Sequence, residues 1–265
     1  MKFGLCTIAS KDDSVEDVLS VAAASGYDGV EIWGRDHVGD RSSGRLASIR
    51  ETAADRNLDI PVYGSYLRPG TPDYEERAET ELDVASELDA SLIRVWAGEQ
   101  EYEEFTQEHW NGVVEDLRDL SNRAAERGLE VTVERHAGTL TNARDGARLL
   151  VEAVDRENVR LNWQPRFDLP AEEILASARE LAPLSNNVHL QGAPGPGDPW
   201  PDQAPLDEAY FDVHTVLEAF ENAGFDGYVE IEFVTDETEF ETAARRDREY
   251  LATVVEGEKL TTADR

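Results

Sequence analysis

Short runs of β-branched and other apolar residues alternate with longer, acid-rich amphipathic segments along almost the whole chain, and this alternation restricts the fold more than any other feature. Such alternation is typical of repeated strand–helix units around a parallel sheet. The sequence contains eight such units. Their strands are expected at residues 2–8, 28–33, 59–65, 91–97, 129–135, 158–164, 186–191 and 228–234, each followed by a helix.

The expected strands have one apolar and one polar face, because side chains alternate between the faces of a strand. In the last strand, Val229, Ile231 and Phe233 share one face, and Glu230 and Glu232 share the other. Three earlier strands alternate in the same way. An open sheet covered by helices on both sides would need almost continuously apolar strands. The polar face is therefore expected to line the lumen of a closed barrel.

The chain has 265 residues, and one barrel of this kind typically needs roughly 250. We therefore predict an α/β protein with a single-domain (β/α)8 TIM barrel at residues 1–257 and a short polar C-terminal tail at residues 258–265. No glycine-rich phosphate-binding motif follows the first strand, which disfavours a dinucleotide-binding fold.

Glycines mark several of the expected turns from helix to strand. A left-handed glycine commonly ends a helix, and this role is expected for Gly26, Gly128 and Gly224. Residues 26–32, GYDGVEI, also resemble residues 224–231, GFDGYVEI. One favourable turn used twice is sufficient to explain this repeat.

The chain is strongly acidic, with 57 Asp and Glu against 25 Lys and Arg and a formal net charge of -32. Such a field repels phosphate backbones, so we expect no nucleic-acid partner. The acids are spread through the helical segments rather than collected in one tail. This pattern indicates a halophilic protein, because high salt screens the repulsion between like charges.

Cys6 is the only cysteine, which excludes an internal disulfide and a multi-cysteine zinc cluster and fits a reducing compartment. No apolar run approaches the roughly 20 residues that cross a bilayer. The first residues also lack the regions of a signal peptide. We expect a cytoplasmic protein with no membrane partner. Whether the protein forms a homo-oligomer stays open.

Four consecutive strands end in potential metal ligands on the polar face: Glu134, Gln164, His189 and Glu232. Barrel active sites gather at these carboxyl ends. Two carboxylates, an imidazole and an amide oxygen suit Mn²⁺, Mg²⁺ or Co²⁺ better than a metal that prefers thiolates. Taken singly, a strand-end glutamate is more often an arginine partner, and a lone histidine is more often a satisfied, half-buried group. The prediction therefore depends on their shared face and position.

Three short motifs resemble one known family. They are residues 133–141, VERHAGTLT, at the fifth strand, residues 187–191, NVHLQ, at the seventh, and residues 224–233, GFDGYVEIEF, at the eighth. They are similar to motifs of the sugar phosphate isomerase/epimerase superfamily, the xylose isomerase-like TIM barrels of the AP endonuclease 2-type family. The resemblance implies that Glu134, His189 and Glu232 bind a metal. The family often has an aspartate ligand at the sixth strand, where this chain has Gln164, so the site has one negative charge fewer.

The resemblance implies a metal-assisted isomerase or epimerase that acts on a small sugar or polyhydroxy carbonyl compound. The metal would stabilise an enediolate, and Glu134 and Glu232 would remove and return a proton. A lyase that dehydrates a keto-polyol would use the same groups, and Gln164 lends weight to a non-catalytic sugar-binding barrel. A DNA-repair endonuclease of the related barrels would need more histidine ligands than the five histidines present.

Further side chains near the strand ends are candidates for binding the substrate. His136 shares the polar face with Glu134, and Trp200 lies in a Gly- and Pro-rich stretch that could cover the site. Arg94 and Arg166 could bind a phosphate. Because the chain has no glycine-rich cradle, whether the substrate is phosphorylated stays open. The substrate-binding candidates are His136, Arg94, Trp96 and Trp200, and Glu31, Trp33 and Tyr63 could shape the pocket.

Overall fold

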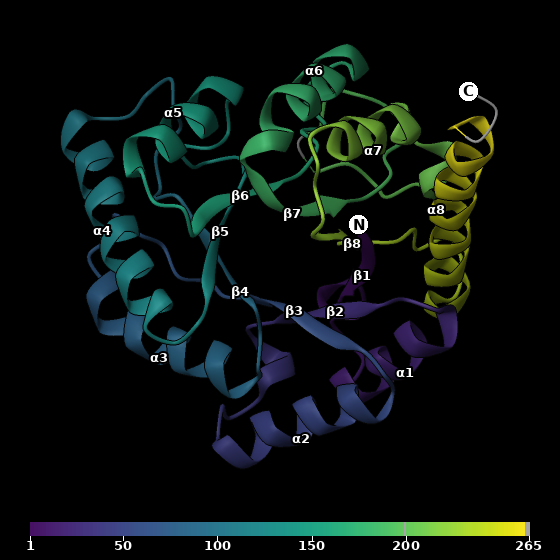
Figure 1. The fold of residues 1–265 in the computed structure, drawn as a ribbon, viewed down its shortest axis with the longest axis horizontal. Coiled ribbons are helices and arrows are strands. Elements are labelled where there is room, and N and C mark those ends of the chain that lie inside the picture. Colours follow the sequence, from purple (N-terminus) through teal and green to yellow (C-terminus); the bar gives the residue numbers. More distant parts are fainter. Residues whose placement is uncertain (199, 263–265) are drawn as a thin grey trace.

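The structure is a computed structural model that describes residues 1–198 and 200–262. Eight parallel strands pair in sequence order and close into a barrel, with β8 beside β1. Figure 1 shows the strands as an inner ring. Their bounds are β1 Lys2–Cys6, β2 Gly29–Trp33, β3 Asp59–Gly64, β4 Leu92–Trp96, β5 Glu130–Glu134, β6 Val159–Trp163, β7 Ser185–Leu190 and β8 Tyr228–Ile231. The predicted (β/α)8 TIM barrel is confirmed.

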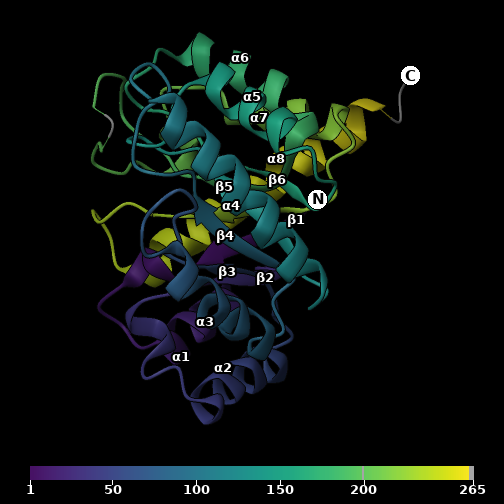
Figure 2. The same cartoon turned by 90° about the vertical axis from the view of Figure 1, so that its left-hand side faces the viewer.

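An outer ring of helices surrounds the strands (Figure 1). These are α1 Val15–Ser25, α2 Ser43–Asp55, α3 Tyr74–Glu87, α4 Gln107–Ala125, α5 Arg144–Val154, α6 Ala171–Leu181, α7 Val213–Asn222 and α8 Phe240–Thr262. In Figure 2 the N-terminus lies on one side of the barrel, and the loops that follow β7 and β8 project from the other side. None of the helices in the described part of the chain is long and apolar enough to cross a membrane.

The glycines expected at the helix ends have the predicted conformation. Gly26, Gly128 and Gly224 have φ angles of 80°, 73° and 75°, which L-residues with a side chain rarely adopt. At Gly26, the backbone N–H donates to carbonyl groups in the last turn of α1. These left-handed residues turn the chain from helix to strand.

The apolar face of each strand packs against the helices, as the alternation predicts. Val131, Val133, Leu161 and Trp163 are fully buried in this outer core. Tyr63 also lies there, because its hydroxyl donates to Glu81 of α3 at 2.6 Å. Tyr63 was expected to shape the pocket, but this contact holds its ring on the helix side of the sheet.

The opposite faces of the strands fill the lumen with polar groups. Glu31, Arg94, Glu134, His189 and Glu230 are all buried, at 3% exposure or less. Charged groups so far from water must neutralise or hydrogen-bond one another, because an isolated buried charge is very costly. The lumen is therefore a polar network at the centre of an apolar shell.

Some strands end earlier than predicted. β6 ends at Trp163 and β8 at Ile231, so Gln164 and Glu232 lie one residue past them. Pro165 cannot donate a backbone hydrogen bond, which fits the early end of β6. At the other terminus, α8 continues to Thr262, inside the segment predicted as a tail. The domain boundary at residue 257 stays a prediction, and residues 263–265 lie outside the described part.

Candidate metal and active site

Three of the four predicted ligands meet at the carboxyl end of the barrel. One ligand atom each from Glu134, His189 and Glu232 lies within 4.8 Å of the others, and all three residues are buried. Gln164 is 7% exposed, and its side-chain oxygen has no hydrogen-bond partner among the described residues. It lies one residue past the end of β6, where Trp163 pairs with Val188 of β7, the residue before His189, but no recorded contact joins Gln164 to the other three.

Glu134 is held by two donors from β4. The Arg94 guanidinium and the Trp96 indole N–H both donate to its Oε2 atom. Burial acts to raise the pKa of Glu134, but the charges of Arg94, His136 and His189 and the Trp96 hydrogen bond together outweigh this effect, and the pKa lies below its usual value. Glu134 is therefore a carboxylate, and it has the arginine partner that is common for a glutamate at a strand end.

His189 has one ring nitrogen engaged and one free. Its Nε2 atom lies 2.8 Å from Glu31 Oε2, whereas its Nδ1 atom has no hydrogen-bond partner and lies 3.6 Å from Glu232 Oε1. A carboxylate that accepts from Nε2–H fixes the ring and leaves the Nδ1 lone pair available to a metal. Burial lowers the pKa of His189, but Cys6, Glu31 and Glu232 raise it more. Metal binding to Nδ1 would therefore displace a proton from His189.

Glu31 is a residue of the site to which the sequence analysis gave no metal or catalytic role. It accepts from Arg94 Nε at 2.9 Å as well as from His189, and so it joins the two cations of the lumen. Burial raises its pKa, but Arg94 and His189 together lower it to about 2. Gly64 of β3 leaves room for this pair, because a Cβ atom there would lie 2.7 Å from Arg94 Nη2 and closer still to Glu31.

A second layer lies deeper in the lumen. Asn187 Nδ2 donates to Glu230 Oε2 at 2.8 Å and to Asn162 Oδ1 at 3.2 Å. Burial, aided by the charge of Glu31, raises the pKa of Glu230 to about 8, so this group is largely protonated at neutral pH. Cys6 lies below the site, with its Sγ atom 3.6 Å from His189 Nε2, and burial raises its pKa well above the usual value.

The charges and free atoms of the lumen fit a divalent cation. Three glutamates, Glu31, Glu134 and Glu232, supply negative charge. Arg94, which is always positively charged, contacts Glu31 and Glu134. The side-chain oxygen of Gln164 is an acceptor with no hydrogen-bond partner among the described residues, and the Nδ1 atom of His189 becomes an acceptor when the ring loses its proton. Buried acceptors without a donor are costly, and a bound cation would satisfy them.

Aromatic side chains extend from the site to the surface. Trp96 stacks on His136 with ring centroids 4.7 Å apart, and His136 lies 5.1 Å from Trp200. Trp200 is 65% exposed, and the Gly- and Pro-rich loop does place it near the site. His136 Nδ1 donates to the Ala137 carbonyl at 2.5 Å, which leaves Nε2 able to exchange a proton.

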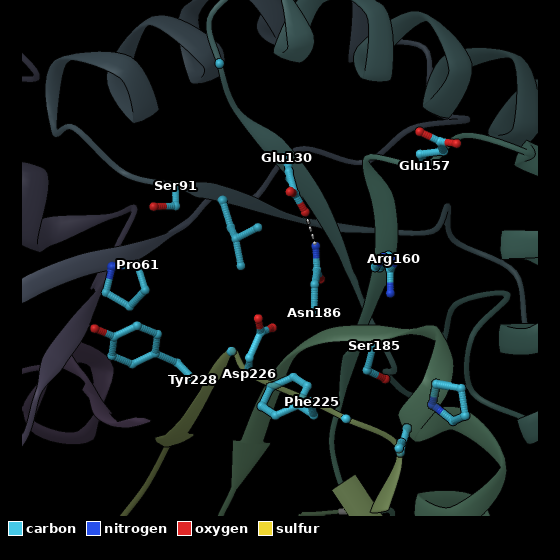
Figure 3. A pocket seen from close by; sticks show the side chains of 17 residues that line it. Pro61, Ser91, Glu130, Glu157, Arg160, Ser185, Asn186, Phe225, Asp226 and Tyr228 are labelled. Carbon is cyan, nitrogen blue, oxygen red and sulfur yellow. Dashed lines mark hydrogen bonds between the residues drawn. The ribbon is translucent and has the colours of Figure 1, made fainter. Parts of the chain in front are cut away.

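A cavity of about 470 Å³ opens at the other end of the barrel (Figure 3). It is lined by residues at the amino ends of the strands, including Glu130, Arg160, Asn186 and Tyr228. Asn186 donates to Glu130 at 3.2 Å, and no predicted site residue takes part. Active sites of such barrels lie at the carboxyl ends of the strands, so we place the candidate site at the Glu134 end.

The family model for the xylose isomerase-like TIM barrel matches residues 19–254 of the sequence. The chain belongs to this family. The resemblance predicted from the three short motifs is therefore confirmed. In this xylose isomerase-like barrel, the match includes every strand from β2 to β8 and so all three residues of the Glu134–His189–Glu232 cluster.

Similar proteins have different activities. The 3-dehydroshikimate dehydratase of Bacillus anthracis is 27% identical over 72% of this chain and 71% of that protein. The fructoselysine 3-epimerase of Escherichia coli O157:H7 is 24% identical over 89% of this chain and 91% of that protein. A solved structure of a xylose isomerase-like TIM barrel protein from Mycobacterium smegmatis in complex with magnesium has a TM-score of 0.75, with 17% identity and 96% of each chain covered. The structural match shows the shared fold alone.

Proposed function

We propose that this barrel removes the proton next to the carbonyl of a small polyhydroxy carbonyl compound and then eliminates water from it. The observation that carries the proposal is the buried convergence of Glu134, His189 and Glu232 within 4.8 Å at the carboxyl end of the barrel. Paired carboxylates beside a metal-ligating imidazole suit proton transfer at carbon. The dehydratase relative supports water loss as the outcome.

Glu134, His189 and Glu232 would hold a divalent cation, and the side-chain oxygen of Gln164 would be a further ligand. The metals that we expect are Mn²⁺, Mg²⁺ or Co²⁺. The magnesium complex of a protein with the same fold supports this class of ion. When bound, the cation would polarise the substrate carbonyl and stabilise the negative charge that develops on its oxygen.

The chain's own groups would move the protons. Arg94 and Trp96 keep Glu134 ionised and oriented, and this carboxylate can accept the proton from carbon. The electron pair left behind forms the carbon–carbon double bond as the neighbouring C–O bond breaks. His136 can carry a proton on Nε2 and pass it to the departing hydroxyl, which leaves as water. The rings of Trp96 and Trp200, which both contact the His136 ring, would exclude solvent and orient the substrate.

Epimerisation is the second candidate, and the nearness of Glu134 and Glu232 favours it. Two carboxylates on opposite sides of one carbon can remove a proton from one face and return it to the other. This reaction needs no leaving group. Isomerisation between aldose and ketose would use the same two carboxylates, and the epimerase relative supports this group of reactions.

The test is incubation with Mn²⁺ in deuterated water with 3-dehydroshikimate, inososes and a panel of ketoses and aldoses. We expect one keto-polyol to lose water and gain the ultraviolet absorbance of a conjugated carbonyl. Deuterium in a recovered sugar without water loss would favour the epimerase or isomerase. If no substrate exchanges a proton or loses water, the proposal is wrong and a non-catalytic sugar-binding barrel is left.

A further inference from the structure

We propose that Arg35 and Arg68 form an anion subsite at the mouth of the barrel, so that the substrate carries a carboxylate or phosphate group. This inference rests on the proposed function, because it names the class of substrate that the same site would accept. Arg35 lies two residues past the end of β2, and Arg68 lies four residues past the end of β3. Both are therefore at the end of the barrel that holds Glu134, His189 and Glu232.

The subsite is built on two aromatic rings. Tyr66 and Trp96 meet edge to face, with ring centroids 5.1 Å apart. The indole N–H of Trp33 donates to the Tyr66 hydroxyl at 2.8 Å, and the indole N–H of Trp96 donates to Glu134. These hydrogen bonds fix the two rings relative to the catalytic carboxylate.

Each ring carries one arginine. The guanidinium carbon of Arg35 lies 3.9 Å from the centroid of Tyr66, and that of Arg68 lies 4.2 Å from the centroid of Trp96. A guanidinium that contacts an aromatic face keeps its N–H groups along its edge, where they can bind carboxylate or phosphate oxygens as a fork. Arg68 uses one of these groups to donate to the Gly98 carbonyl at 3.0 Å. The Arg35 side chain has no recorded hydrogen bond or ion pair within the described ranges.

Two other arginines at this end of the barrel are already paired with carboxylates, whereas the buried Arg135, next to Glu134, donates to the Gln164 carbonyl and the Ser177 hydroxyl instead. Arg94 contacts Glu31 and Glu134, and Arg166 lies 2.7 Å from Asp168. These two were the open candidates for phosphate recognition, and their charges are engaged. Arg35 and Arg68 have no carboxylate in recorded contact among the described residues, although the chain has a net charge of -32.

An anionic substrate would need such a subsite. Glu134 and Glu232 line the site, and the acidic surface adds a long-range repulsion. Two cations held on rings beside the catalytic carboxylate would offset this repulsion and fix the orientation of the substrate. Arg68 is half-buried, and burial lowers its pKa, as expected for a cation whose charge is only partly compensated.

The test is equilibrium binding, so that it does not depend on turnover. Tryptophan fluorescence or calorimetry would measure the affinity for three probes: shikimate, which has a carboxylate, an inositol phosphate, and neutral myo-inositol. We expect at least one anionic probe to bind about 10-fold tighter than myo-inositol in the same salt, because charge-assisted hydrogen bonds are the strong ones. The preferred probe identifies the carboxylate or the phosphate as the group recognised.

Arg35→Gln and Arg68→Gln should each weaken binding of the preferred anionic probe by about 10-fold and leave myo-inositol unchanged. Arg179→Gln on the exposed end of α6 is the control, because it removes the same charge outside the mouth. Equal affinity for all three probes, or equal losses with anionic and neutral probes, would overturn the subsite. A barrel that binds the anion but converts no substrate would refute the proposed reaction and leave the subsite standing.

Discussion

Glu134→Gln should lower turnover of the substrate by about 10³-fold or more, because it removes both a proton acceptor and a negatively charged metal ligand. Glu134 is 1% exposed and accepts from Arg94 and Trp96, so the amide keeps the shape of the side chain and loses the charge. The measurement is kcat with saturating Mn²⁺. Glu232→Gln should have an effect of the same order, because Glu232 contributes to the same cluster.

The matched control is Glu130→Gln. Glu130 lies on the same strand as Glu134 but at the opposite, exposed end. Its substitution should leave kcat within about twofold of the unmodified protein, because solvent-exposed charges far from a site contribute little. Full activity of both Glu134→Gln and Glu232→Gln would contradict the assignment of the two carboxylates.

Arg94→Met should reduce the free energy of unfolding by about 3–5 kcal/mol, because it leaves buried carboxylates without their cation. The Arg94 side chain is 4% exposed, and its two partners, Glu31 and Glu134, are each 2% exposed. Urea denaturation at constant salt would measure the loss. Added Mn²⁺ should recover part of it, since the cation would neutralise Glu134 in the folded state alone.

Arg246→Met is the control for this second prediction. Arg246 pairs with Asp207 and Glu208 at the surface, where its side chain is 42% exposed. Its loss should cost about 0–1 kcal/mol, because exposed ion pairs are screened by solvent. An equal, small cost for Arg94→Met would show that the lumen network does not depend on its arginine.

The barrel could be predicted from the sequence because one local rule fixes both the strands and their inner face. Val131 and Val133 had to face apolar neighbours, and Glu134 therefore had to face the other way. The same rule placed His189 and Glu232 on the lumen side. The exact strand ends could not be predicted from this rule. Strand β8 ends at Ile231, although the alternation of apolar and polar residues continues to Phe233.

The partners inside the lumen could not be predicted in the same way. Glu31 and Arg94 lie on strands that are not neighbours, and their contact depends on the room that Gly64 leaves between them. The similar GYDGVEI and GFDGYVEI segments each carry a glutamate, Glu31 and Glu230, but the barrel places them at different levels, beside Cys6 and Gly4 of β1. Both glutamates lie in the polar lumen, so the similarity of the segments did not reveal which partners each one contacts.

The measurement that tests the account most directly is a Mn²⁺ titration followed by electron paramagnetic resonance, in high monovalent salt that weakens binding to surface carboxylates. We expect about one tightly bound ion per chain. His189→Gln and Glu232→Gln should each weaken this binding at least about 10-fold, because each removes a ligand of the cluster. Unchanged stoichiometry and affinity in both variants would show that the divalent ion, if it binds, does not bind between Glu134, His189 and Glu232.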